Sequence, residues 1–299
     1  MLATISSISA MSKAAAKTEN DNDPTSDTAL RSLWLDWLNT ADAGRDQAIE
    51  SRQRGSEQMG TEQIESEPTE SQQRKPEQIE QAYHRLIDSQ TRRADLLDLS
   101  GLGLRSLPAY FPIHTTILRL NDNYLDAMPE NLPPSLTHLY IESNLLSSLG
   151  FNFPASTTAL FAADNRISVF PELPLHNLRI LSLDRNRIGA WPQYFAPYLR
   201  ELYVSGNLLS EFPPDLPSEL AILSIERNRI DTLPEKLPAN LRRLLADHNL
   251  LRSVTSNLLE LPAPAFVNLA DNQLPSTIVN QIKSFSQAPH YDGPRIHLD

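Results

Sequence analysis

Apolar and polar residues alternate through the middle of the chain in a frame that repeats every 21 residues. Each copy holds two leucine-like residues separated by one position, as in Leu181-Ser182-Leu183, and an asparagine three residues after the second. Such alternation predicts a short β-strand with one buried face. The asparagines of the frame are Asn123, Asn144, Asn165, Asn186, Asn207, Asn228 and Asn249, followed after 23 residues by Asn272.

An earlier copy of the frame, around Leu97 and Leu99, places Leu102 where the asparagine would stand, so residues 94–274 hold about nine units. One unit cannot bury its own leucines, but stacked units can, and their strands then form a parallel sheet. After each strand the chain must turn, and an asparagine side chain can bond the backbone groups that the turn leaves unpaired. We therefore predict an α/β-type repeat solenoid, a horseshoe with short parallel strands on its concave face and a structural asparagine ladder.

Prolines mark the segments that return the chain from one strand to the next. Of the 23 prolines, 18 lie between Pro108 and Pro275, most of them in pairs such as Leu233-Pro234 and Leu237-Pro238. Proline lacks a backbone donor and breaks helices, so the convex side is predicted to be extended and polyproline-like.

Two helical caps are predicted before the repeats. Residues 27–50 contain an amphipathic helix whose apolar face is Leu30, Leu33, Trp34, Trp37 and Leu38. Residues 77–93 predict a second cap helix. The two tryptophans either cover the first repeat or form a stripe that binds a partner; we prefer the first interpretation because the open ends of solenoids need caps.

The remaining flanks differ in composition. Residues 1–26 are rich in serine, alanine and threonine, and we expect them to be disordered. Residues 51–76 are so polar that they predict a flexible insertion. Residues 275–299 predict a C-terminal cap followed by a short tail.

The amino-acid composition excludes several classes of function. The formal net charge is −11 and there is no cysteine. The acidic balance argues against nucleic acid and anionic lipid as partners. The missing cysteines exclude disulfides and thiolate chemistry, which is consistent with a reducing compartment or with unfolding during export. No apolar run is long enough to cross a membrane, so we expect no membrane insertion.

Catalytic and cofactor motifs are also absent from the sequence. The seven histidines have no metal-ligand spacing, no glycine-rich loop could hold a phosphate, and no nucleophile elbow accompanies the serines. We expect no catalysis by this chain, no cofactor and no metal.

The concave face is therefore the candidate functional site. In each unit the residue between the two apolar positions and the two residues before the asparagine should point outward. Most are small or charged, but Tyr140, Phe161, Tyr203 and Leu245 are large, and aromatic residues among charges are typical of binding hot spots. Aromatic residues also suit strands for their own sake. We predict a protein-binding face formed by Tyr140, Glu142, Phe161, Asp184, Arg185, Tyr203, Glu226 and Arg227.

The proline-rich unit, as in Asn228-Arg229-Ile230-Asp231-Thr232-Leu233-Pro234-Glu235-Lys236-Leu237-Pro238, resembles the leucine-rich repeats of bacterial type III effectors. Among these it is most similar to the IpaH-like E3 ubiquitin ligases. The segment Leu30-Arg31-Ser32-Leu33-Trp34-Leu35-Asp36-Trp37 resembles the family's N-terminal capping helix. The tail from Ser286 to His297 resembles the junction with its catalytic domain.

The resemblance implies a targeting role. Residues 1–26 would be a type III export signal, and the protein would act in the cytoplasm or nucleus of a host cell. The repeats would select a host protein and restrain the ligase domain. That domain works through a cysteine, which this chain lacks.

Two interpretations follow from the missing cysteine. The chain is either a fragment of a ligase whose catalytic cysteine lies outside it, or a non-catalytic scaffold or decoy of the YopM type. The junction-like residues Gly293-Pro294-Arg295-Ile296 favour the first. An extracellular inhibitor of the plant type is disfavoured by the repeat length, the missing cysteine pairs and the missing glycan acceptor sites.

Overall fold

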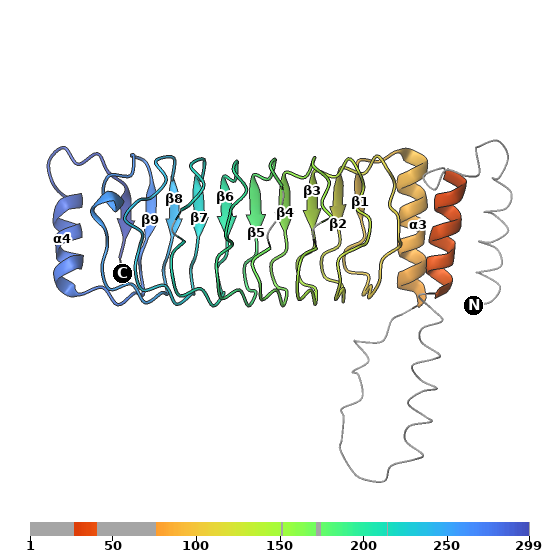
Figure 1. The fold of residues 1–299 in the computed structure, drawn as a ribbon, viewed down its shortest axis with the longest axis horizontal. Coiled ribbons are helices and arrows are strands. Elements are labelled where there is room, and N and C mark those ends of the chain that lie inside the picture. Colours follow the sequence, from red (N-terminus) through yellow and green to blue (C-terminus); the bar gives the residue numbers. More distant parts are fainter. Residues whose placement is uncertain (1–26, 41–75, 151, 172–174, 214, 299) are drawn as a thin grey trace, which may run out of the picture. The chain divides into compact units, whose positions relative to one another are not determined.

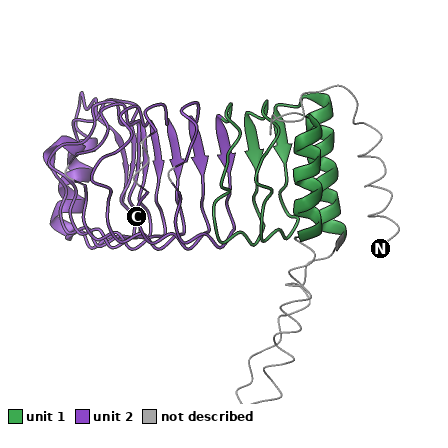
Figure 2. Ribbon diagram, turned by 45° about the vertical axis from the view of Figure 1, so that its right-hand side comes forward, with its two compact units in different colours: residues 1–136 green, residues 137–299 purple. Residues whose placement is uncertain are grey.

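The computed structural model describes residues 27–40, 76–150, 152–171, 175–213 and 215–298. Contacts divide the chain into two compact units, residues 1–136 and residues 137–299, and each is described by itself (Figure 2). The predicted export signal, residues 41–50 of the first cap and nearly all of the predicted insertion lie outside the described residues.

Unit 1 begins with two helices. The first covers residues 27–40, and α3 covers Pro76–Arg92 (Figure 1). Leu30 and Trp34 are fully buried and Trp37 is 8 % exposed. The Trp34 indole Nε1 donates a hydrogen bond to the backbone oxygen of Tyr110, 2.7 Å away in the first return segment. The tryptophans therefore pack within the cap and leave no exposed stripe for a partner.

The second helix rests on the first repeat. Ile79, Tyr83 and Leu86 are buried, and the Arg85 guanidinium donates to the backbone oxygen of Asp98 at 2.9 Å. Strands β1 (Leu96–Asp98) and β2 (Ile117–Arg119) follow and pair in parallel. The apolar face of α3 thus covers the open edge that a first repeat would otherwise expose.

Unit 2 is a solenoid of about eight turns built on a parallel sheet (Figure 1). Each strand pairs with the next one in the sequence, one repeat apart, so that Leu160 lies opposite Leu181 and Leu181 opposite Leu202. The strands are β3 (His138–Tyr140), β4 (Ala159–Phe161), β5 (Ile180–Ser182), β6 (Glu201–Tyr203), β7 (Ile222–Ser224), β8 (Arg243–Leu245), β9 (Phe266–Asn268) and β10 (Arg295–His297).

The middle residue of each strand from β3 to β9 forms the core. Leu139, Leu160, Leu202, Leu223 and Leu244 have no exposed surface, and the residue two positions further on is buried in the same way. Side chains alternate along a strand, so the first and third strand residues point to the opposite side. The 21-residue period therefore stacks one column of apolar side chains behind the sheet. The side chains on the other side of the sheet remain available for function.

The asparagines bond each turn to the one before it. Asn186 Nδ2 donates to the backbone oxygens of Leu183 and Asp184 in its own repeat, and to that of Ala162 in the previous one. Its Oδ1 accepts the N–H of Ile167 at 3.0 Å. The same pattern recurs at Asn165, Asn207, Asn228, Asn249 and Asn272, and Asn123 makes equivalent bonds in unit 1.

The residue before each asparagine adopts a left-handed backbone conformation. Its φ is positive at Asp122, Ser143, Asp164, Arg185, Gly206, Arg227, His248 and Asp271. This conformation reverses the chain after the strand, and L-residues other than glycine, asparagine and aspartate adopt it at a cost. Arginine at two of these positions is therefore unfavourable for the backbone.

The described parts of the return segments are turns and extended backbone, apart from the linker before β9. The linker before β9, two residues longer than the others, contains the short 3-10 helix η2 (Ser256–Leu258). The sequence predicted extended returns, and the two additional residues account for the departure.

The C-terminal residues complete a further turn. Helix α4 (Ser276–Ser286) follows β9, and β10 then pairs in parallel with β9, placing Ile296 opposite Val267. Gly293 packs closely, because a Cβ there would lie 2.7 Å from the backbone oxygen of Leu259. Gly293-Pro294-Arg295-Ile296 therefore has a role inside the solenoid. The resemblance of this segment to a junction with a following domain stays a prediction.

Candidate protein-binding face

The strand face of unit 2 carries the predicted site. We define it, for β3 to β9, as the first and third strand residues and the two residues before the asparagine. All eight predicted residues lie on it: Tyr140, Glu142, Phe161, Asp184, Arg185, Tyr203, Glu226 and Arg227. All are half-buried or exposed, and the periodic strands hold them in fixed register.

The aromatic part of the face begins at β3 and β4. The Tyr140 and Phe161 rings stack with their centroids 4.6 Å apart and their planes 6° from parallel. This separation is close to the spacing of neighbouring strands, so each ring stands upright on its strand. Both rings are half-buried, which leaves part of a rigid apolar surface for a partner.

Tyr203 is the third aromatic residue of the predicted site. Its hydroxyl donates to Glu201 Oε2 at 2.8 Å. Burial and then this hydrogen bond raise the pKa of Tyr203 to about 12. The phenol therefore stays protonated, and its ring is held toward the start of β6.

Asp184 is the most perturbed carboxylate of the face. Burial raises its pKa to about 6, against the opposing effects of the Ser205 N–H and of Arg185. Asp184 Oδ1 accepts the Ser205 N–H at 2.7 Å. Among the described residues nothing donates to the other oxygen, Oδ2, which leaves one side of this carboxylate free for a ligand.

The two arginines differ in their surroundings. Arg185 forms a bidentate ion pair with Asp164 in the preceding turn. Arg227 is exposed and makes no ion pair within the described part of the chain. Arg185 is thus already engaged, whereas Arg227 can meet a partner directly.

Hydrogen bonds order the acidic residues further along the face. Glu226 Oε2 accepts from the hydroxyls of Ser205 and Ser224, both at 3.1 Å. Beyond them, Asp247 Oδ1 accepts from Asn268 at 2.7 Å, and Asp247 Oδ2 lies 2.9 Å from His248 Nδ1. These bonds fix the side chains before any partner binds.

Four of the positions expected to be exposed are buried. Ala163, Ser182, Ser224 and Asp247 are between 3 and 9 % exposed, because larger neighbours on adjacent strands shield these small or hydrogen-bonded side chains. The first residue of each strand points to the same side and was not predicted to be part of the face. Ile180, Glu201, Ile222, Arg243 and Phe266 belong to this missed row. The strict alternation of the strands was the signal that could have identified it.

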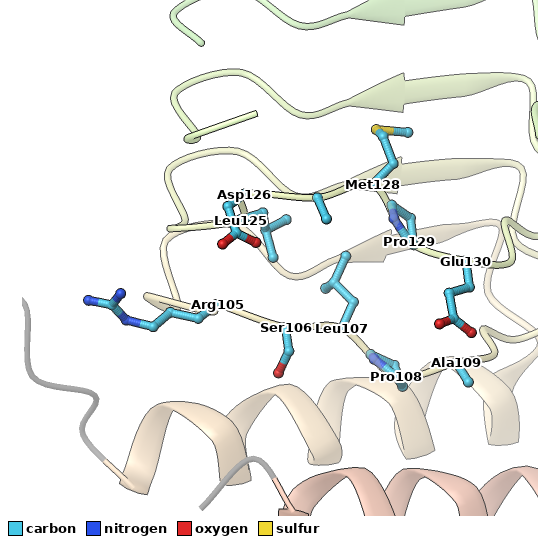
Figure 3. A pocket seen from close by; sticks show the side chains of 11 residues that line it. Arg105, Ser106, Leu107, Pro108, Ala109, Leu125, Asp126, Met128, Pro129 and Glu130 are labelled. Carbon is cyan, nitrogen blue, oxygen red and sulfur yellow. The ribbon is translucent and has the colours of Figure 1, made fainter. Parts of the chain in front are cut away.

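The return side offers other surfaces. In unit 2, Phe170, Trp191, Phe195 and Phe212 form a chain of ring contacts, with Tyr194 and Tyr198 exposed nearby. In unit 1, a hollow of about 300 Å³ opens between the first two return segments, lined by Arg105, Leu107, Asp126, Met128 and Glu130 (Figure 3). Neither surface combines ordered charges with aromatic residues as the strand face does.

The described residues lack two further classes of site. No group of three or more histidine, aspartate or glutamate side chains there could hold a metal ion. None of the helices in the described ranges is both long and apolar enough to cross a membrane.

Comparison with known proteins identifies the repeat. A family model of the leucine-rich repeat matches residues 198–220. No curated protein sequence matches the chain. The structure is similar to the leucine-rich-repeat domain of a Shigella effector, with 28 % identity over 74 % of this chain and 89 % of that chain, at a TM-score of 0.55.

Two other solved structures are similar. YopM, a leucine-rich effector protein from Yersinia pestis, is 27 % identical over 83 % of this chain and 67 % of its own, with a TM-score of 0.59. A leucine-rich-repeat protein of Leptospira interrogans, 23 % identical over 58 % of this chain and 47 % of its own, shares the fold at a TM-score of 0.52. The chain therefore carries a leucine-rich-repeat domain whose structural neighbours include bacterial effectors.

Proposed function

We propose that this chain is the target-recognition domain of a bacterial effector and that it binds a host protein on the strand face of unit 2. The observation that carries the proposal is the combination of upright, stacked rings at Tyr140 and Phe161 with the ordered charges around Asp184. Rigid aromatic residues surrounded by polar groups supply most of the binding free energy at protein interfaces. The similarity to two effector repeat domains supports the bacterial origin.

The mode of binding follows from the face. A partner would bury the exposed parts of Tyr140, Phe161 and Tyr203, and its polar groups would pair with Asp184 and Arg227. The existing hydrogen bonds hold these side chains in place, so little conformational entropy is lost on binding.

The proposal is tested with the full chain as bait in a host-cell extract. Any retained protein is then titrated against the variant Phe161→Ala/Tyr203→Ala. We expect affinity to fall at least about 30-fold, which corresponds to about 2 kcal/mol for a hot spot. The matched control is Tyr194→Ala/Tyr198→Ala, which removes two exposed rings on the return side. A partner lost by the control and kept by the first variant would place the interface elsewhere.

Within this role we propose that the domain selects substrates for an E3 ubiquitin ligase and restrains the ligase domain until a target binds. The resemblance of the tryptophan helix and of the tail to that family supports the assignment. Secretion through a type III system into the host cell belongs to the same proposal.

A non-catalytic scaffold or decoy is the second candidate. It is favoured by the similarity to YopM and by the use of residues 293–297 as part of the solenoid. The reading frame beyond the codon for Asp299 distinguishes the candidates. A cysteine-containing helical domain encoded there would support the ligase, and a stop codon the scaffold. In either case the present chain should transfer no ubiquitin in vitro.

A further inference from the structure

The row of aromatic residues on the strand face is interrupted at one strand. The register places Tyr140 beside Phe161, Phe161 beside Ser182, and Ser182 beside Tyr203, on neighbouring strands β3 to β6 (Figure 1). A small side chain therefore lies between two large rings. Ser182 is 7 % exposed because its larger neighbours shield it, and its hydroxyl makes no hydrogen bond to any described residue.

The spacing of the two rings suits one planar group. Tyr140 and Phe161, one strand apart, stack at 4.6 Å. Phe161 and Tyr203 are two strands apart, which corresponds to about 10 Å in a parallel sheet. A cation midway would lie about 5 Å from each ring, within the range of about 6 Å over which cations are attracted to aromatic faces.

The charges beside this position are negative. Asp184 lies two residues after Ser182, and Glu201 lies two residues before Tyr203. Burial raises the pKa of the Asp184 carboxyl, and the positive charge of Arg185, adjacent in sequence, offsets this only in part. Arg185 does not supply that charge fully because its guanidinium is paired with Asp164.

The strand face as a whole also carries a net negative charge. Seven carboxylates stand against three guanidinium groups on the strand face as defined above. The carboxylates belong to Glu142, Asp164, Asp184, Glu201, Glu226, Asp247 and Asp271, and the guanidinium groups to Arg185, Arg227 and Arg243. This charge attracts a basic partner and repels an acidic one.

We propose that Phe161, Ser182, Tyr203 and Asp184 form an arginine-binding position, which receives a guanidinium group from the partner protein. The inference rests on the proposed function and specifies the chemistry of the partner. Arginine fits better than lysine because its flat group can stack between rings while its separate N–H groups donate hydrogen bonds to two acceptors at once. Asp184 Oδ2 and the Ser182 hydroxyl are the acceptors available to it.

The test uses the full chain and a defined ligand. Acetyl-Gly-Arg-Gly-amide is titrated against the isotope-labelled protein, and NMR shifts are followed at Phe161, Ser182, Asp184 and Tyr203. The comparison ligand replaces arginine with citrulline, which keeps the shape and removes the charge. We expect saturable shifts with arginine and binding at least about tenfold weaker with citrulline.

Amino-acid substitutions test where the arginine side chain binds. Ser182→Phe fills the space with a third ring and should abolish binding, whereas Ser182→Ala keeps the space and should retain it. Asp184→Asn should weaken binding about tenfold. The matched control, Asp271→Asn, makes the same charge change elsewhere on the face and should leave binding within about twofold. Asp184→Asn also serves as the deciding variant if Ser182→Phe does not fold.

Equal binding of the arginine and citrulline peptides, or arginine-induced shifts confined to other residues, would overturn the arginine-binding position. Unchanged affinity in Asp184→Asn would do the same. These results would leave the proposed function standing, because that depends on the capture experiment with Phe161→Ala/Tyr203→Ala. If only the capture experiment failed, the proposed host partner would be ruled out, but the binding of arginine at this position would not.

Discussion

Asn207 Oδ1 accepts a hydrogen bond from the backbone N–H of Ile188, 3.0 Å away and 19 residues earlier in the chain. Asn207 Nδ2 donates to three backbone oxygens, those of Leu183, Val204 and Ser205. One buried amide thus satisfies groups of two successive repeats. The ladder therefore stabilises the stacking of turns in addition to each turn by itself.

Replacing Asn207 by alanine should lower the free energy of unfolding by about 2–3 kcal/mol, because buried backbone groups would lose their partners. Urea unfolding followed by circular dichroism measures the change. The control is Asn240→Ala, whose exposed amide makes a single hydrogen bond to the backbone oxygen of Ser218 at 3.1 Å. We expect it to cost below about 1 kcal/mol. Equal losses in the two variants would contradict a special role for the ladder.

Arg227→Gly should raise the free energy of unfolding by about 0.5–1 kcal/mol. Arg227 has a φ of +52°, which costs a residue with a Cβ more than it costs glycine, and glycine already occupies the equivalent position at Gly206. The comparison variant is Arg185→Gly, at a φ of +50°. It should gain less because it also loses the surface ion pair to Asp164. Thermal unfolding ranks the stabilities of the two variants. A loss of stability in Arg227→Gly would contradict the cost assigned to the positive φ at this position.

The stacking of strands was predictable from the sequence because it depends only on period and alternation. The 21-residue spacing of residues such as Leu181 and Leu202 determines the register. The structural role of the asparagines followed from the need to satisfy the turn backbone. The left-handed residues before them were not predicted, since arginine and histidine at such positions run against intrinsic preference.

The binding face was predictable only in outline. Ile180 and Ile222 precede the core leucines directly, so in the sequence they look like part of the core. The bond from Tyr203 to Glu201 and the sharing of Glu226 by Ser205 and Ser224 depend on side-chain conformations that periodicity does not specify. The pairing of the tail with β9 was not predicted because it requires α4 to bring the chain back to the sheet.

Asp184 should make stability fall as pH rises from about 4 to 6. Its pKa is about 6 in the folded protein and about 3.9 in the unfolded chain, so in this window the folded state binds more protons. Ionising the carboxylate therefore opposes folding, and the effect is complete above pH 6. Allowing for its partial exposure, we expect about 1–2 kcal/mol.

The measurement compares the wild type with Asp184→Asn in urea at several values of pH. The asparagine Oδ1 can still accept the Ser205 N–H, but it does not titrate. The difference in unfolding free energy between variant and wild type should grow in favour of the variant from pH 4 to 6 and then level off. A difference independent of pH would mean that Asp184 titrates normally.

Gly293→Ala should destabilise the C-terminal turn by about 2 kcal/mol or more, since overpacking forces side chains or backbone to move. A Cβ there would lie 2.5 Å from the Tyr291 hydroxyl oxygen and 2.7 Å from the backbone oxygen of Leu259. The control is Gly189→Ala, where no described atom lies within 4 Å of the new methyl group.

Combining Gly293→Ala with Tyr291→Ala separates the two contacts. Removing the ring relieves one of them, but the Leu259 carbonyl belongs to the backbone and cannot rotate away. We expect the alanine at 293 to cost less in the Tyr291→Ala background than in the wild type, and still more than Gly189→Ala. Full recovery would assign the whole effect to the Tyr291 ring. Amide exchange along β10 gives the site-specific measurement, because detachment of this strand from β9 would expose the Leu269 N–H that now donates to His297 at 2.8 Å.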